Sequence, residues 1–209
     1  MITYTFEPEV VMVGGGTFPT HQIPLALIHY TEKVLCLDGA ADICNEKDII
    51  PWRIVGDGDS LSPDLRKKHA DCIRTFPDQE TNDQTKGILY LLKKGYKHIG
   101  IVGATGKRED HTLGNISLLT EYKKAGADVR IYTDHGVFIP CCGKTTFGCP
   151  TGTAVSIFGF GTKGMKAKGL AYPLRDFTAL WQGTLNRSTA PSFEISCEGE
   201  YLVFLNYPS

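Results

Sequence analysis

Two aspartates placed two residues apart are the strongest chemical signal in this chain. Residues 56–60 read Gly-Asp-Gly-Asp-Ser and follow an apolar pair that is typical of the end of a buried parallel strand. If the backbone stays extended, Asp57 and Asp59 project to the same side. Two converging carboxylates repel each other unless a cation lies between them, and hard oxygen ligands suit Mg²⁺. The alternative is a simple turn that carries two solvated aspartates.

Other polar motifs also follow strand-like runs. Asp38 and Gly39 follow the apolar run 34–37, and Asn82 is a plausible N-cap for a helix that continues to Lys94. Asp83 and Lys86 lie three residues apart in the first turn of that helix, where they are either site residues or an exposed ion pair. Ligands of open α/β sheets bind outside the carboxyl ends of the strands. These motifs therefore indicate one site at such an edge.

Two glycine-rich segments favour phosphate binding. Residues 14–16 are three glycines after the apolar run 10–13, but they do not form a dinucleotide fingerprint, so a plain turn and a nucleotide contact are both open. The segment 103–108 reads Gly-Ala-Thr-Gly-Lys-Arg, and the sequence predicts a helix from about Asp110 to Gly126. A phosphate at that helix N-terminus would meet free N–H groups and two cationic side chains. His111 and Asn115 share one face of this helix, either as site residues or as a structural polar pair.

Composition excludes several classes of protein. The chain has 209 residues with 42% hydrophobic residues, 22% charged residues and a net charge of −1. A protein with so little net charge is not expected to bind nucleic acid or a membrane surface through bulk electrostatic attraction. The first residues lack a signal-peptide pattern, and no apolar run reaches the ~18 residues of a membrane span. The seven cysteines include no C-x-x-C pair, and their spacing does not fit a structural zinc site. Their number is odd, so we expect free thiols and a reducing compartment, the cytoplasm.

The order of predicted elements indicates an α/β fold with two domains. Strands and helices alternate as far as residue 134, which predicts a parallel sheet. Beyond it, short strand-like runs are separated by turns, at 137–139, 144–147, 154–160, 165–170, 192–196 and 201–205, which predicts a small all-β domain. We place the domains at residues 1–136 and 137–209.

Taken together, these motifs resemble the thiamine pyrophosphokinase family in order and spacing over nearly the whole chain. The N-terminal motifs are residues 37–40, 56–60, 78–86 and 106–111, and residues 168–174 and 183–186 look like that family's thiamine-binding domain. The resemblance implies a Rossmann-like parallel-sheet catalytic domain, a C-terminal β-sandwich domain, and a homodimer with sites shared between subunits. The chain departs from the family's usual residues at Gly58 (a large residue), Asn82 (Thr), Lys107 (Gly), Tyr172 (Trp) and Leu185 (Ser).

The resemblance also assigns roles to individual residues. The positions associated with magnesium are Asp38, Asp57, Asp59 and Asp83. The positions implied in catalysis are Asp57, Asp59, Asp83 and Arg108. The positions on the ATP side are Asp38, Gly39, Lys86, Gly106, Arg108, Asp110, His111 and Asn115. Those on the thiamine side are Tyr172 and Asn186.

The implied reaction is transfer of the pyrophosphoryl group of ATP to the hydroxyl of thiamine, with AMP as the leaving group. Such transfer relies on positioning and charge neutralisation, for which Mg²⁺ held by carboxylates, with Lys and Arg, is suitable. Two other functions remain open. One is a different Mg²⁺-dependent small-molecule kinase or phosphohydrolase, and the other is a non-catalytic protein that binds nucleotide or thiamine. The sequence does not choose a general base.

Overall fold

The computed structural model describes residues 1–57, 61–76 and 80–208. They form two compact units, a first unit of Glu7–Asp134 and a second unit that joins Met1–Phe6 to His135–Ser209. The sequence-based bounds place residues 1–6 in the first domain, whereas in the structure Ile2 forms a bridge with Phe147. The N–H of Ile2 donates to the Thr146 carbonyl at 2.8 Å, and the Ile2 carbonyl accepts from Gly148 at 2.7 Å. These backbone bonds attach the N-terminal segment to a distant strand, which no local pattern reveals.

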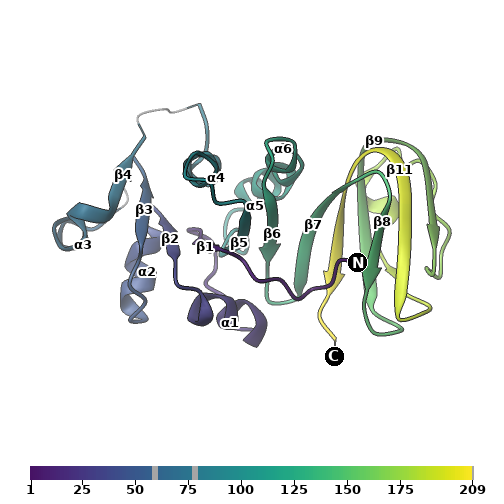
Figure 1. The fold of residues 1–209 in the computed structure, drawn as a ribbon, viewed down its shortest axis with the longest axis horizontal. Coiled ribbons are helices and arrows are strands. Elements are labelled where there is room, and N and C mark those ends of the chain that lie inside the picture. The colour runs from purple at the N-terminus through teal and green to yellow at the C-terminus, as the bar shows by residue number, and fades with distance from the viewer. Residues whose placement is uncertain (58–60, 77–79, 209) are drawn as a thin grey trace. The chain divides into compact units, whose positions relative to one another are not determined.

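The first unit contains the parallel sheet that the alternating pattern predicts. Its strand order is β6-β5-β1-β2-β3-β4 (Figure 1). The strands are β1 (Val10–Val13), β2 (Val34–Leu37), β3 (Arg53–Gly56), β4 (Ile73–Thr75), β5 (His98–Val102) and β6 (Asp128–Tyr132). From β1 the chain adds β2, β3 and β4 on one side and then returns to add β5 and β6 on the other. The order of the strands therefore reverses between β1 and β5. Ligands of open α/β sheets bind at this kind of reversal.

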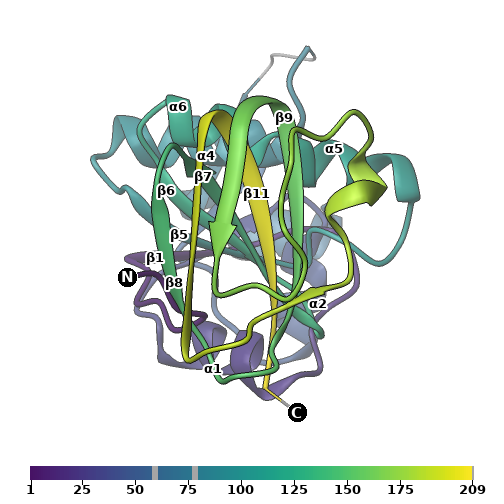
Figure 2. The same ribbon diagram turned by 90° about the vertical axis from the view of Figure 1, so that its right-hand side faces the viewer.

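Helices cover both faces of this sheet, with α1 and α2 on one side and α4, α5 and α6 on the other (Figures 1 and 2). The helical segments are α1 (Gln22–Tyr30), α2 (Ala40–Glu46), α3 (Pro63–Lys68), η1 (Ala70–Cys72), α4 (Asp83–Lys93), α5 (Glu109–Ser117) and α6 (Leu119–Lys124). Helix α4 packs closely on β1 at Gly87, because the missing side chain leaves room for Met12. A Cβ at Gly87 would lie 2.6 Å from the Met12 sulfur. The single helix predicted over 110–126 is wrong, since it is divided at Leu118 into α5 and α6.

The second unit consists of antiparallel strands in the order β10-β9-β11-β7, with β8 also paired to β11. They are β7 (Gly136–Cys142), β8 (Thr145–Gly148), β9 (Ala154–Lys168), β10 (Asn186–Arg187) and β11 (Ser192–Asn206), with η2 (Leu180–Gly183) between β9 and β10. Strands β9 and β11 run side by side (Figure 2). Each merges two of the predicted short runs, because register shifts between Ser196 and Glu200 let the chain pass the glycines without ending the strand.

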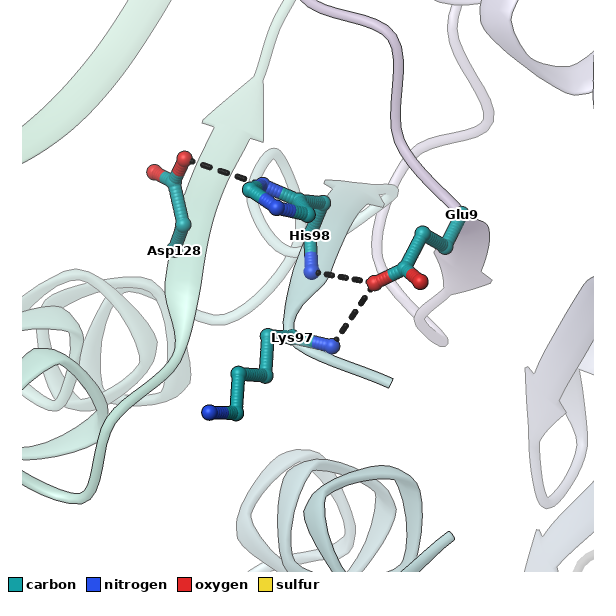
Figure 3. Close-up of polar contacts among 4 residues, drawn as sticks. All are labelled: Glu9, Lys97, His98 and Asp128. Carbon is teal, nitrogen blue, oxygen red and sulfur yellow. Dashed lines mark hydrogen bonds and ion pairs between the residues drawn. The ribbon is translucent and has the colours of Figure 1, made fainter. Parts of the chain in front are cut away.

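A single carboxylate fastens the start of β1 to the start of β5. Glu9 Oε2 accepts hydrogen bonds from the backbone N–H groups of Lys97 at 2.8 Å and His98 at 2.9 Å (Figure 3). The His98 ring, in turn, lies 3.2 Å from Asp128 Oδ2 at the start of β6. These N–H groups lower the pKa of the Glu9 carboxyl, with the bond from His98 as the larger cause. This end of the sheet is fixed by side chains and has no part in the site below.

The remaining sequence expectations concern membranes and cysteines. In the part of the chain that the structure describes, no helix is long and apolar enough to cross a membrane. All seven cysteines are free thiols. Cys141 is buried and its neighbour Cys142 is exposed, as expected for successive residues of a strand. The two thiols therefore point to opposite faces of β7, which does not favour zinc.

Candidate functional site

A pocket of about 910 Å³ lies at the carboxyl edge of the parallel sheet, entirely within the first unit. Its walls come from the segments that follow β1, β2, β3 and β5 and from the first turns of α4 and α5. This is the position at which the strand order reverses, between β1 and β5. The fold therefore brings five separate sequence motifs to one cavity.

Two glycine-containing loops that line the pocket pair with each other. Gly16 N–H donates to the Gly103 carbonyl at 2.7 Å, and Thr17 N–H donates to the Thr105 carbonyl at 2.8 Å. A Cβ at Gly14 would lie 2.7 Å from the Gly103 carbonyl oxygen, so only glycine permits this approach. The triple glycine is thus both a tight loop contact and a wall of the pocket. The tight turn that the sequence left open is thus confirmed, and the contact with a nucleotide stays a prediction.

Asp38 and Asp57 enter the pocket from adjacent strands. Asp38 follows β2, is only 5% exposed and has a positive φ of 42°. Its N–H donates to the Val55 carbonyl at 2.9 Å, which holds this unusual backbone against β3. Asp57 follows β3 and is exposed at the pocket surface. The two carboxylates are thus presented at one wall, one buried and one open to solvent.

Asp83 and Lys86 come from the first turn of α4. The predicted N-cap is confirmed, because Asn82 Oδ1 accepts from Thr85 N–H at 2.9 Å. Lys86 Nζ lies 3.2 Å from Asp83 Oδ1, and the lysine is only 6% exposed. An exposed helix pair is therefore excluded. A buried ammonium that faces a polar pocket is suited to an anionic ligand.

Arg108 and Asp110 form a fork at the start of α5. The guanidinium donates to Asp110 from Nε at 3.1 Å and from Nη2 at 2.6 Å. This side-chain bond is the main cause that lowers the pKa of the Asp110 carboxyl, and the N–H of His111 adds to it. Both side chains are largely exposed and line the pocket, as His111 does. The carboxylate fixes the guanidinium while leaving other N–H groups for a phosphate.

The structure gathers most of the residues predicted from sequence. The pocket includes Asp38, Gly39, Asp57, Asp83, Lys86, Arg108, Asp110, His111 and Asn115. Asp59 lies outside the described residues. Gly106 has a φ of 91°, and its carbonyl accepts from the Thr17 hydroxyl at 2.7 Å, so it shapes the loop behind the pocket. Within residues 1–57, 61–76 and 80–208, no three Asp, Glu, His or Cys side chains are grouped closely enough to hold a metal ion by themselves.

The two residues predicted for thiamine belong to the second unit. Asn186 is only 5% exposed, and its amide accepts from Tyr172 N–H at 3.1 Å and donates to the Tyr172 carbonyl at 2.9 Å. Tyr172 itself is 64% exposed. Asn186 therefore holds the backbone that presents the tyrosine ring. Trp181 and Leu185 are also strongly exposed in this unit.

Sequence reasoning missed several residues of the pocket. Gln84, Thr105 and Ile43 line it. Gln84 and Thr105 stand within the segments 78–86 and 103–108 but were given no role of their own, and Ile43 lies outside every motif. Gln84 is 3% exposed although it follows Asp83 directly on α4. Helical periodicity could have placed it on the face opposite the solvent, but not in contact with a ligand site.

The site as a whole is suited to a nucleotide polyphosphate. Asp38 and Asp57 line the pocket from strand ends, and Lys86 and Arg108, each paired with a carboxylate, line it from the first turn of α4 and the start of α5. Such an arrangement binds negatively charged phosphates and can position them for transfer.

Comparison with known families gives two matches that together cover most of the chain. The model of the thiamin pyrophosphokinase catalytic domain matches residues 25–132, and that of the thiamin pyrophosphokinase substrate-binding domain matches residues 136–204. The thiamine pyrophosphokinase of Bacillus subtilis (strain 168) is 31% identical over 127 residues, which are 57% of this chain. The matched part spans 58% of the length of that relative, less than two thirds of it.

Solved structures share the fold. A thiamine pyrophosphokinase from Bacillus subtilis superposes with a TM-score of 0.78 at 20% identity and covers 96% of this chain and 99% of its own. Thiamin pyrophosphokinase from Candida albicans gives a TM-score of 0.78 at 18% identity, over 95% of this chain and 90% of its own. At these identities the likeness concerns the fold alone, a mixed α/β architecture.

Proposed function

The chain belongs to the thiamin pyrophosphokinase family, because the model of the family's catalytic domain alone matches residues 25–132. From this membership we propose that the protein converts ATP and thiamine into thiamine diphosphate and AMP. In this reaction the hydroxyl oxygen of thiamine bonds to the β-phosphorus of ATP. The bond from that phosphorus to the oxygen bridging to the α-phosphate breaks, and AMP leaves. The hydroxyl proton is released.

One observation carries the proposal: a single pocket joins acidic and basic residues from separate strand ends. Asp38, Asp57 and Asp83 line it together with Lys86 and Arg108. A purely structural polar cluster would not leave a cavity of about 910 Å³ among these side chains. A volume of this size is within the range of small-molecule sites and accommodates a nucleotide.

The residues of the chain act mainly by position and charge. Lys86 and Arg108 offset the negative charge of the phosphates, and Asp110 fixes the direction of the Arg108 fork. The first residues of α5 line the same pocket, and a helix N-terminus favours anions. Aligning the reacting atoms and neutralising charge are the largest contributions a protein makes to phosphoryl-type transfer.

The carboxylates of the pocket fit a magnesium ion carried by ATP. Mg²⁺ retains several waters and is held by one or two carboxylates plus substrate phosphates, so no preformed cage of three protein ligands is required. Asp57 and Asp38 supply hard oxygen donors at one wall, while Asp83 is engaged with Lys86. When bound, the ion would neutralise developing charge on the phosphate oxygens.

For the thiamine side we propose the second unit. An exposed aromatic ring such as Tyr172 suits a cationic, two-ring substrate through stacking and cation–π attraction. We propose further that the protein works as a cytoplasmic homodimer in which Tyr172 of one subunit serves the acidic site of the other. The description of the first unit as a Rossmann-like catalytic domain and of the second, which includes residues 1–6, as a β-sandwich thiamine domain belongs to the same proposal.

The proposal is tested by incubating the protein with Mg-ATP, with and without thiamine, and separating the nucleotides by chromatography. We expect AMP and thiamine diphosphate in equal amounts, formed only when thiamine is present. ADP would indicate a different kinase, inorganic phosphate without thiamine would indicate a hydrolase, and no turnover would leave a binding protein. Each of these three outcomes contradicts the proposal.

A further inference from the structure

Helix α5 carries the cationic arm of the pocket, yet none of its nine residues is buried. Leu113, for example, is 66% exposed. Apolar burial, which fixes most helices in globular proteins, therefore contributes little to its position. Its C-terminal end continues into α6, whose Leu119 and Tyr122 are buried, whereas the polar contacts of α5 with the rest of the pocket meet, in the described part of the chain, at one residue, Asn115.

Asn115 connects α5 to two other parts of the site. Its Nδ2 donates to the Ala104 carbonyl at 2.8 Å, in the loop after β5. Its Oδ1 accepts from Asn82 Nδ2 at 3.1 Å, and its backbone carbonyl accepts from Gln84 Nε2 at 3.0 Å. Asn82 and Gln84 flank the first residue of α4, so two bonds tie the start of α4 to the middle of α5.

The direction of the Asn82–Asn115 bond is fixed by backbone groups. Asn82 Oδ1 must face the Thr85 N–H, which can only donate, so Nδ2 is turned toward Asn115. Asn115 Nδ2 must face the Ala104 carbonyl, which can only accept, so Oδ1 is turned toward Asn82. Neither amide can be flipped without placing two donors or two acceptors together. Asn82 therefore has two separable tasks: it caps α4 and it bridges to α5.

We propose that Asn82 is a positioning residue, whose bridge to Asn115 sets Arg108 and Asp110 on α5 relative to Asp83 and Lys86 on α4. This deepens the proposed function and rests on it for the identity of the ligand, ATP. The bridge aligns the two charged arms before the nucleotide arrives. Without it, the polar bonds that join α5 to the rest of the pocket in the described residues are the one from Gln84 and the one to the Ala104 carbonyl, so the arms are less well ordered and must be arranged by the ligand.

The experiment separates the bridge from the cap. Asn82→Ser keeps a good N-cap but is too short to reach Asn115, whereas Asn82→Ala removes both. Ser117→Ala is the matched control, since Ser117 donates only to Gly114 within α5 and lies outside the pocket. For each variant we would measure the Tm, the Kd for ATP by titration, and amide hydrogen exchange over residues 109–117 without ligand.

We expect Asn82→Ser to keep the wild-type Tm, to weaken ATP binding about three- to tenfold, and to speed exchange in α5. Ser117→Ala should match wild type. The double variant Asn82→Ser with Asn115→Ala should bind ATP no more weakly than Asn115→Ala alone, because both changes remove one bridge. Additive losses, with unchanged α5 exchange, would mean that Asn82 contacts ATP directly and would overturn the proposal. Wild-type affinity in Asn82→Ser with a defect only in Asn82→Ala would reduce Asn82 to a cap.

Failure of the proposed function is a separate result. If the wild-type protein forms no AMP with thiamine, the reaction is refuted, while ATP titration and exchange in α5 still test the bridge. If wild-type chemistry occurs and Asn82→Ser leaves both exchange and Kd unchanged, the bridge is refuted and the reaction stands.

Discussion

Gly56 is glycine because Asp38 occupies the space that a side chain would need. A Cβ built at Gly56 would lie 2.7 Å from the Cβ of Asp38 and 3.1 Å from its Cγ. The two residues lie at the ends of neighbouring parallel strands, where Leu37 pairs with Val55. The glycine before the Asp57 motif therefore serves a carboxylate on the adjacent strand.

Gly56→Ala should destabilise the protein by about 1–3 kcal/mol, the usual cost of overpacking a tight site. Urea unfolding would measure it. The cost should largely vanish in an Asp38→Gly background, since that change removes the Cβ and suits the positive φ at position 38. An equal cost in both backgrounds would show that Asp38 is not the obstacle.

Asp57→Asn should fold normally and lose about 10²–10³ in kcat/KM, because it removes one electrostatic element of the site. Steady-state AMP formation and the Tm would be measured together. Asp64→Asn, an exposed aspartate in the first turn of α3, is the control and should stay at wild-type activity. Turnover within a few-fold of wild type for Asp57→Asn would contradict its place in the active site.

Arg108→Ala should lower kcat/KM for ATP by about 10²-fold, and Arg108→Lys should recover only part of it. Lysine retains the charge but not the planar fork that binds Asp110 through two bonds. Lys124→Ala removes an exposed cation of α6 that pairs with Glu121 and serves as the control. ATP titrations in which all three variants match wild type would leave Arg108 as a surface charge.

Glu9 should make stability depend on pH on the acid side. Because its pKa is lowered in the folded state, its contribution is present above the unfolded pKa of about 4.3 and is lost as the pH falls through the folded pKa. Glu9→Gln should cost about 0.5–1 kcal/mol at pH 7 and flatten this dependence. Urea unfolding between pH 3 and pH 7 would measure it, with the exposed Glu7→Gln as control. Parallel curves for wild type and Glu9→Gln would be evidence against the effect.

The shared site predicts complementation between two inactive variants. Random mixing of Asp57→Asn and Tyr172→Ala chains gives about half hybrid dimers, each with one intact site of two. About a quarter of wild-type activity should therefore return. Sites built within single subunits would give no recovery, and mass spectrometry of the mixture would verify that hybrids form.

The sequence determined several elements of the first unit because their signals are local, although it did not show the division of α5 from α6. Apolar runs of four residues predicted β1 and β2 with correct bounds, and Asn82 was identifiable as an N-cap from its type and position. Motifs at the ends of successive strands also pointed to one edge of a parallel sheet. That much follows from periodicity and from the rule for strand ends.

Tertiary structure alone decided how these residues meet. The Asn82–Asn115 bridge joins α4 to α5, and the burial of Lys86 and the place of the Arg108–Asp110 pair in the pocket depend on how these elements pack. The pairing of Ile2 with Phe147 and the merging of short runs into β9 and β11 likewise depend on partners far along the chain. Local propensity cannot encode such partners, because the free energy that selects them arises only when distant segments pack together and bury their apolar surface away from water.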